Sequence, residues 1–304
     1  MSETTETGGI GGRAGTATVP APAPAADPAP NVPPAAAMTA VSLADVGKTF
    51  RSAKGSLVEA LRGVSLDIAE GEFVCLVGAS GCGKSTLLRL VAGFETATTG
   101  SVTVRGKQVR APGPDRGVVF QDYGLFPWLS VENNIAYGPR QRGVPRSQIA
   151  EITARYLELV QLERFADRYP HQLSGGMQQR VALARVLAND PAVLLMDEPF
   201  GALDSLTREK LQYRLLEIWQ QVRSTVVFIT HNVEEAVFLA DRVVVMSGGP
   251  NHGIPGHIAE VTRVDLPHPR DVTSPEFNEI RRDLLEVVHR EISATGADDL
   301  DSEA

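Results

Sequence analysis

The sequence predicts an α/β fold with a mainly parallel sheet, and three observations lead to this expectation. Short apolar runs such as 193–196 and 225–230 are continuous, which is typical of strands covered on both faces. Segments with helical periodicity lie between these runs. A glycine-rich loop at 78–83 joins a strand-like run to a helix-like one. Alternation of strands with helices is the pattern of α/β proteins.

The expected elements follow one another from Val41 onward, where alternation and β-branched residues indicate the first strands. Further strands are expected at 73–77, 101–104, 117–120, 193–196, 225–230 and 242–246. Helices are expected at 84–94, 148–160, 178–188 and 206–222. Ser274 and Pro275 form a good N-cap and N1 pair for a closing helix. Its apolar stripe consists of Phe277, Ile280, Leu284, Val287 and Val288.

Four segments are expected along the chain. Residues 1–38 are rich in Pro and Ala and are expected to form a disordered tail. One α/β domain is expected over 39–265, followed by a C-terminal helical extension over 266–293. Residues 294–304 are expected to form a disordered acidic tail.

Composition narrows the class of protein. Of 304 residues, 43% are hydrophobic and 22% charged, so a sizeable core is possible. The net charge of −8 has the wrong sign for a protein whose binding depends on neutralising nucleic-acid phosphates. The apolar runs are far shorter than the roughly 18 residues of a membrane-spanning helix. With two cysteines, Cys75 and Cys82, and no secretory leader pattern, a reducing cytosol is the expected location.

The glycine-rich loop matches the phosphate-binding motif G-x-x-x-x-G-K-[ST] between an expected strand and an expected helix. Glycines allow the turns that aim backbone N–H groups inward, and the helix N-terminus adds positive charge there. Lys84 would reach the β and γ phosphates, and the Ser85 hydroxyl would hold Mg²⁺. The alternative is a chance glycine-rich turn. The motif comprises Gly78, Ala79, Ser80, Gly81, Cys82, Gly83, Lys84, Ser85 and Thr86.

Two carboxylates follow the apolar run 193–196 and should lie at the same sheet edge as the glycine loop. Asp197 suits the Mg²⁺ shell. Glu198 would orient, or take a proton from, the water that attacks the γ-phosphate. The alternative for this pair is a solvated strand end.

The segment 173–180, Leu-Ser-Gly-Gly-Met-Gln-Gln-Arg, would present N–H groups and a helix N-terminus to a second phosphate group. An ordinary Ser-Gly-Gly helix start is the alternative. Together with the glycine loop, the Asp-Glu pair and His231, it resembles the signature of ATP-binding cassette (ABC) proteins over nearly all of 41–250. The resemblance implies a P-loop NTPase of the ABC ATPase type at 39–265, with an antiparallel β subdomain and a helical signature subdomain. It also implies hydrolysis of ATP with Mg²⁺.

The resemblance assigns further roles residue by residue. It implies that Phe50 stacks on adenine, although a buried core Phe is the alternative. It implies that Gln121 senses Mg²⁺ and the transporter interface, that Asp204 belongs to the D-loop, and that His231 contacts the γ-phosphate. The signature would complete the ATP site of a second copy, so a homodimer is implied. That signature comprises Ser174, Gly175, Gly176 and Met177.

Four segments resemble the nitrate, sulfonate and taurine importer branch, namely 122–135, 203–208, 233–240 and 273–277. This resemblance implies an ATPase at the cytoplasmic face of the membrane, with two permease subunits and an external solute-binding protein. The implied cargo is a small oxyanion, with aliphatic sulfonates including taurine placed ahead of nitrate. The alternative is a non-transport ABC ATPase acting on nucleic acid or ribosomes.

Overall fold

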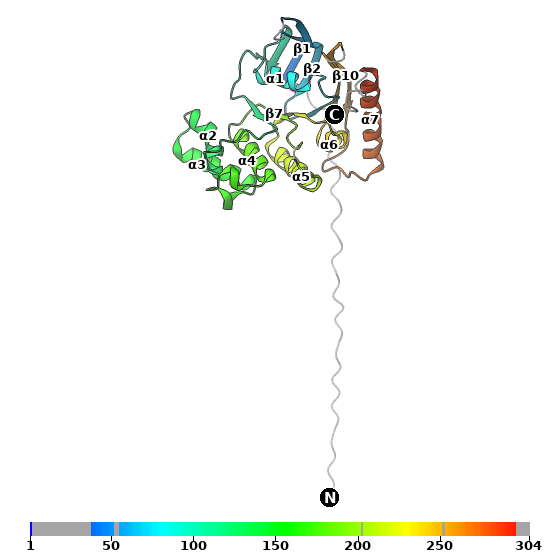
Figure 1. Ribbon diagram of the computed structural model, residues 1–304. Coiled ribbons are helices and arrows are strands. Elements are labelled where there is room, and N and C mark those ends of the chain that lie inside the picture. Colours follow the sequence, from blue (N-terminus) through cyan, green and yellow to red (C-terminus); the bar gives the residue numbers. More distant parts are fainter. Residues whose placement is uncertain (2–37, 52–54, 202, 251–252, 296–304) are drawn as a thin grey trace. The chain divides into compact units, whose positions relative to one another are not determined.

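One mixed sheet runs through the protein and carries helices on both faces (Figure 1). The computed structural model describes residues 1, 38–51, 55–201, 203–250 and 253–295. All elements lie in the unit Ala37–Ala304. The tails expected at 1–38 and 294–304 fall almost wholly outside the described residues.

The bounds of the elements are as follows. The strands are β1 (Thr39–Arg51), β2 (Leu57–Ala69), β3 (Phe73–Val77), β4 (Thr99–Val104), β5 (Lys107–Gln108), β6 (Arg116–Val119), β7 (Val193–Asp197), β8 (Thr225–Ile229), β9 (Arg242–Gly249) and β10 (Ile254–Arg263). The helices are α1 (Lys84–Ala92), α2 (Val131–Gln141), α3 (Arg146–Leu159), α4 (Gly175–Leu187), α5 (Ser205–Val222), α6 (Val233–Leu239) and α7 (Pro275–Thr295), with 3-10 turns η1 (Glu163–Phe165) and η2 (Pro170–Gln172).

The strand order is β5-β4-β1-β2-β10-β9-β3-β8-β7-β6. The part from β9 to β6 is parallel, and in it Leu76 of β3 lies between Ile229 of β8 and Val244 of β9. The strands β5, β4, β1 and β2 pair antiparallel, and β10 joins this half to the parallel half. The expected parallel core with an antiparallel subdomain is therefore confirmed.

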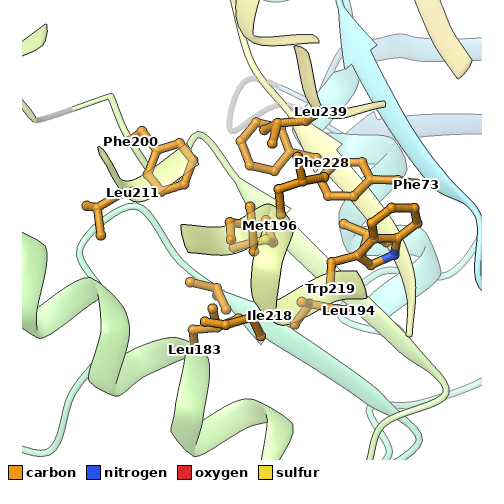
Figure 2. Close-up of a cluster of buried hydrophobic side chains, with 14 of the residues drawn as sticks. Phe73, Leu183, Leu194, Met196, Phe200, Leu211, Ile218, Trp219, Phe228 and Leu239 are labelled. Carbon is orange, nitrogen blue, oxygen red and sulfur yellow. The ribbon is translucent and has the colours of Figure 1, made fainter. Parts of the chain in front are cut away.

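The parallel strands separate two hydrophobic cores, because successive side chains of a strand point to opposite faces. In β3, Phe73, Cys75 and Val77 face a core covered by α4, α5, α6 and α7. Val74 and Leu76 face a second core that includes α1 and the antiparallel strands. Figure 2 shows the first core, where Phe73 meets Trp219 edge-on and lies beside Phe228. Burial on both faces explains why these strands read as continuous apolar runs.

The helices α2, α3 and α4 pack on one another and form the green group in Figure 1. This group is the expected helical subdomain. The signature helix was expected to begin at residue 178, but α4 begins at Gly175, because the Ser174 side chain accepts a hydrogen bond from Met177 N. The signature glycines thus lie in the first turn of the helix.

The segment between β10 and α7 closes the C-terminal end of α6. Arg270 is 3% exposed and donates hydrogen bonds to the carbonyls of Leu266, Val237, Ala240 and Val264. A helix end leaves carbonyls without partners, and this guanidinium satisfies two of them at α6. The α6 helix therefore depends on a residue about thirty positions later in the chain.

His268 lies beside this cap, with Nε2 3.2 Å from the Leu239 carbonyl oxygen and its ring edge-on to Trp219. Burial lowers the pKa of His268 from 6.5 to about 4, and the positive charge of Arg270 acts in the same direction. The folded protein thus keeps a neutral ring at pH values where the unfolded chain takes up a proton.

We expect the free energy of unfolding to fall as the pH drops from 6.5 toward 4, because only the unfolded state gains the His268 proton in that window. The loss should be roughly 1–2 kcal/mol, less than the full shift implies, because the ring is partly exposed. Urea unfolding of wild type and His268→Gln at pH 7.5, 6 and 5 measures it. The difference between the two proteins should shrink with falling pH, and a constant difference would contradict the assignment.

Candidate functional site

A cavity of about 410 Å³ lies where the carboxyl ends of β3, β7 and β8 meet the start of α1. Most of its lining comes from the glycine-rich loop, and two residues come from the ends of the neighbouring strands. The lining residues are Gly78, Ser80, Gly81, Gly83, Lys84, Ser85, Thr86, Glu198 and His231. The topology thus brings three separate sequence segments to one place.

The backbone of the glycine-rich loop takes a conformation that requires glycine at two positions. Gly78 has a φ of 146°, and a Cβ at this position would lie 2.1 Å from the Met246 carbonyl oxygen. Gly83, with a φ of 101°, is the N-cap of α1, and no side chain caps this end. The free N–H groups of the first turn of α1 therefore remain available to a phosphate.

The Lys84 side chain lies along the loop and is only 7% exposed. Its Nζ donates to the carbonyls of Gly78, at 2.7 Å, and Ala79, at 2.8 Å, and lies 3.7 Å from Cys82 Sγ. Cys82 itself is fully buried, and burial raises the pKa of its thiol. The thiol is therefore protonated and the ammonium is the charge that faces the cavity.

Ser85 and Asp197 form a pair of oxygen donors at the edge of the cavity. The Ser85 hydroxyl donates to Asp197 Oδ1 at 3.1 Å. Burial raises the pKa of Asp197, and the charge of Glu198 adds to this. A bound cation would favour the ionised carboxylate. A hydroxyl and one carboxylate fit Mg²⁺, which completes its shell with phosphate oxygens and water.

Glu198 and His231 face each other across the cavity, with His231 Nδ1 3.6 Å from Glu198 Oε2. Glu198 has a φ of 44°, which is uncommon for a residue with a side chain. Its backbone N–H donates to the Ile229 carbonyl, and its own carbonyl accepts from Gly201 N. The end of β8 and the loop after β7 therefore hold the Glu198 backbone in a left-handed conformation.

Asn232, directly after His231, has a structural role at the start of α6. Asn232 caps α6, and its Oδ1 accepts hydrogen bonds from Glu234 N at 2.9 Å and Glu235 N at 3.3 Å. The ABC resemblance leads one to expect Asp here. Asn supplies the same acceptor oxygen, so the cap is kept.

The predicted D-loop and Gln121 lie beside Glu198 but do not line the cavity. A Cβ on Gly201 would lie 3.5 Å from Gln121 Nε2 and 3.8 Å from Glu198 Oε2. Asp204 caps α5, accepting from Thr207 N at 3.0 Å, and these hydrogen bonds lower its pKa. Gly201 of the D-loop and the Gln121 side chain therefore both lie close to the Glu198 carboxylate.

The signature residues lie apart from the cavity, at the start of α4. Cβ atoms on Gly175 and Gly176 would lie 3.4 Å from Leu203 and 3.2 Å from Thr207, so α4 packs against the D-loop and the start of α5. Met177, where the resemblance leads one to expect Gln, packs against the hydrophobic core. Ser174 remains exposed.

Phe50 does not line the cavity either. It is half-buried in β1, opposite Val58 of β2, and Lys48 Nζ lies 4.7 Å from the centroid of its ring. The ammonium group thus already occupies one face of this ring. The adenine role of Phe50 stays a prediction.

Sequence reasoning missed polar residues that hold the loops of the site. Arg185 of α4 donates to the carbonyls of Tyr123 and Gly124 and lies 5.3 Å from the centroid of the Phe126 ring. Glu235 of α6, 5% exposed, accepts a hydrogen bond from Gln212 of α5. In the sequence, Arg185 and Glu235 are polar positions of a helix, and such positions are normally expected to face solvent.

Comparisons with known proteins agree with this geometry. The family model described as ABC transporter matches residues 61–201. An ABC transporter ATP-binding protein of Methanocaldococcus jannaschii, MJ0412, is 51% identical over 78% of this chain and 87% of its own length. The nitrate import ATP-binding protein NrtD of Synechocystis is 46% identical over 80% of this chain and 89% of its own length.

Two further matches are a transport ATP-binding protein and a solved dimeric structure. The bicarbonate transport ATP-binding protein CmpC of Synechococcus elongatus is 47% identical over 81% of this chain, which corresponds to 37% of that longer protein. The solved dimeric cassette MJ0796, bound to ADP and phosphate, has a TM-score of 0.62 and 32% identity over 74% of this chain and 99% of its own. Among the described residues of this chain, no helix is long and apolar enough to cross a membrane.

Proposed function

The chain belongs to the ABC transporter family and is an ATPase, and from this premise we propose that it powers an importer of small oxyanions. Two copies would form a head-to-tail dimer, with each ATP between the glycine loop of one copy and the signature of the other. Two permease subunits would bind the dimer at the cytoplasmic face of the membrane. An external solute-binding protein would deliver the cargo.

The observation that carries the catalytic part is the convergence of Lys84, Ser85, Glu198 and His231 on one cavity. Lys84 and the free N–H groups of α1 bind the phosphates, and Ser85 and Asp197 would hold Mg²⁺. Bound Mg²⁺ would supply positive charge to the β and γ phosphates. Because phosphoryl transfer depends mainly on positioning and charge, these fixed groups account for most of the rate.

Glu198 provides the group that handles the proton. Water attacks the γ-phosphorus while the bond to the departing ADP oxygen breaks, and the proton of the water passes to the Glu198 carboxylate. His231, 3.6 Å from that carboxylate, would contact the γ-phosphate. Gln121, beside Gly201, would report the state of the site to the permease.

The separation of the signature from the cavity supports the dimer. Ser174 is exposed and caps the first turn of α4, and it lies outside the set of residues that line the cavity. A helix N-terminus of this kind binds phosphate groups. A second copy can bring such a terminus to the open side of the cavity, as the dimeric form of the solved relative suggests.

An exposed aromatic surface on the helical subdomain supports the permease contact. Trp128 is 70% exposed and its ring centroid lies 5.7 Å from that of Phe126, which packs on Tyr137 of α2. The fully buried Asn134 fixes this loop, because its side chain bonds the backbone of Phe126 and Leu129. Exposed aromatic residues on a rigid support are typical of protein interfaces.

A groove of about 850 Å³ lies between α2 and α3, on the same subdomain. Apolar side chains including Val144, Ile149 and Leu157 line it, with Arg140 and Arg146 at its rim. The buried hydroxyl of Thr153 has no hydrogen-bond partner among the described residues. We propose that a short amphipathic helix of the permease occupies this groove.

The cargo part of the proposal rests on relatives that transport nitrate and bicarbonate by name, and on the branch resemblance to sulfonate and taurine importers. These solutes share a small size and an anionic oxygen group. We expect a strain lacking this chain to lose growth on nitrate as sole nitrogen source or on alkanesulfonates as sole sulfur source. Growth on ammonium and sulfate should continue.

Complementation provides the control for this experiment. The wild-type gene should restore growth and Glu198→Gln should not, although both chains reach the same level in the cell. Loss of bicarbonate-limited growth alone would place the cargo with the third oxyanion. Normal growth of the deletion strain under all three conditions would overturn the oxyanion assignment.

A further inference from the structure

A buried acidic side chain behind His231 is the starting point. Glu235 is 5% exposed, and its carboxylate accepts a hydrogen bond from Gln212 Nε2 at 2.8 Å. Its backbone N–H donates to Asn232 Oδ1 at 3.3 Å. Thr230 immediately precedes His231, and its hydroxyl oxygen accepts from Asn232 N at 3.0 Å. The two residues that flank His231 are therefore bonded to each other, and Asn232 is bonded to Glu235.

Gln212 and its neighbour Arg208 carry this connection into α5. Arg208 lies one turn before Gln212, and its Nη2 donates to the Leu203 carbonyl of the D-loop at 3.0 Å. A small cavity of about 10 Å³ is lined by residues of three segments, among them Glu198, Arg208, His231 and Glu235. The buried Arg208 Nε has no hydrogen-bond partner among the described residues.

The residues around Glu235 belong both to α5 and to the loop that carries His231. Burial raises the pKa of Glu235, and the hydrogen bond from Gln212 and the positive charge of Arg208 act in the opposite direction. Gln212 Nε2 donates a hydrogen bond to this carboxylate. A buried carboxylate without a hydrogen-bond partner destabilises the folded protein, so the bond from Gln212 to Glu235 should be kept.

We propose that Gln212 and Glu235 position His231 by joining its loop to α5. The D-loop (201–204) would then control the position of His231 within the same subunit. The connection runs from Leu203 through Arg208 and along one turn of α5 to Gln212, then through Glu235 and Asn232 to Thr230. The inference rests on the role proposed above for His231.

This connection has a physical reason to affect hydrolysis. The D-loop contacts the signature helix, since a Cβ on Gly175 would lie 3.4 Å from Leu203. A contact that shifts Leu203 therefore moves the first turns of α5, a rigid helix of 18 residues. Misplacing a group that contacts the reacting phosphate lowers the rate without removing the binding contacts of the nucleotide.

The test is a double-mutant cycle on the purified full chain. Gln212→Met keeps the volume of the side chain and removes the hydrogen bond to Glu235. We expect ATP turnover to fall about five- to tenfold, while the ATP dissociation constant changes by less than about twofold. In a His231→Ala background the same substitution should cause no further loss, because the residue that it positions is absent.

Controls separate positioning from general damage. Gln220→Met, on the exposed face of α5, should leave turnover and melting temperature unchanged. If Gln212→Met does not fold, Glu235→Gln takes its place in the cycle. An equal loss in the wild-type and His231→Ala backgrounds would show a merely structural role and overturn the inference.

The outcome also distinguishes this inference from the proposed function. If His231→Ala hydrolyses ATP at the wild-type rate, the switch role of His231 fails and the inference fails with it. If His231→Ala is slow and Gln212→Met is as fast as wild type, only the positioning role is overturned.

Discussion

Glu198→Gln should bind ATP with nearly the wild-type affinity and lose turnover by about 10²- to 10⁴-fold, the range expected when a general base is removed. The amide keeps the shape of the side chain and can still orient water, but it cannot accept the proton. Because hydrolysis is the step that fails, the ATP-bound dimer should accumulate. Phosphate release and size-exclusion chromatography with ATP and Mg²⁺ measure the two effects.

A matched control uses a carboxylate on an exposed helix face. Glu209→Gln in α5 removes the same charge outside the cavity and should leave turnover unchanged. Phosphate release by Glu198→Gln at more than about a tenth of the wild-type rate would contradict the role of Glu198 as the base.

Lys84→Ala and Ser174→Arg should each be nearly inactive alone and should recover activity when mixed. The first loses the ammonium that faces the phosphates, and the second blocks the N-cap of the signature helix. A mixed dimer holds one complete site, made of the glycine loop of one copy and the signature of the other. Random assembly should therefore restore about a quarter of the wild-type rate.

The control for cooperativity is a dimer of wild type with Lys84→Ala, which also holds one complete site. If this dimer is active and the verified Lys84→Ala with Ser174→Arg dimer is not, the shared-site arrangement is wrong. Circular dichroism should show that Ser174→Arg keeps α4, because loss of an N-cap costs only about 1 kcal/mol.

The parallel core could be predicted from the sequence because its signals are local. A strand buried on both faces must be apolar at every position, as in 225–229, and the glycine loop has a fixed spacing between lysine and hydroxyl. The strand β10 escaped prediction because most of its residues are only half-buried or exposed and because it includes a proline and a glycine. Its existence depends on pairing with β9 rather than on its own pattern.

The helix α6 and the residues behind it could not be derived for a different reason. Seven residues are too few to establish a helical period, and α6 is capped at its end by Arg270 from far along the chain. Gln212 and Glu235 likewise read as ordinary polar positions of two helices. Only the packing of α5 against α6 makes them a buried pair.

The capping of α6 by Arg270 has a consequence during synthesis of the chain. Translation proceeds from the N-terminus, so the glycine loop, Glu198 and His231 are all synthesised before Arg270. Until then the carbonyls of Val237 and Ala240 lack the partner that they have in the finished protein. A polypeptide terminated after β9 would contain every residue that lines the cavity and still leave the end of α6 without its cap. We therefore expect proteases to degrade such a fragment faster than the finished protein.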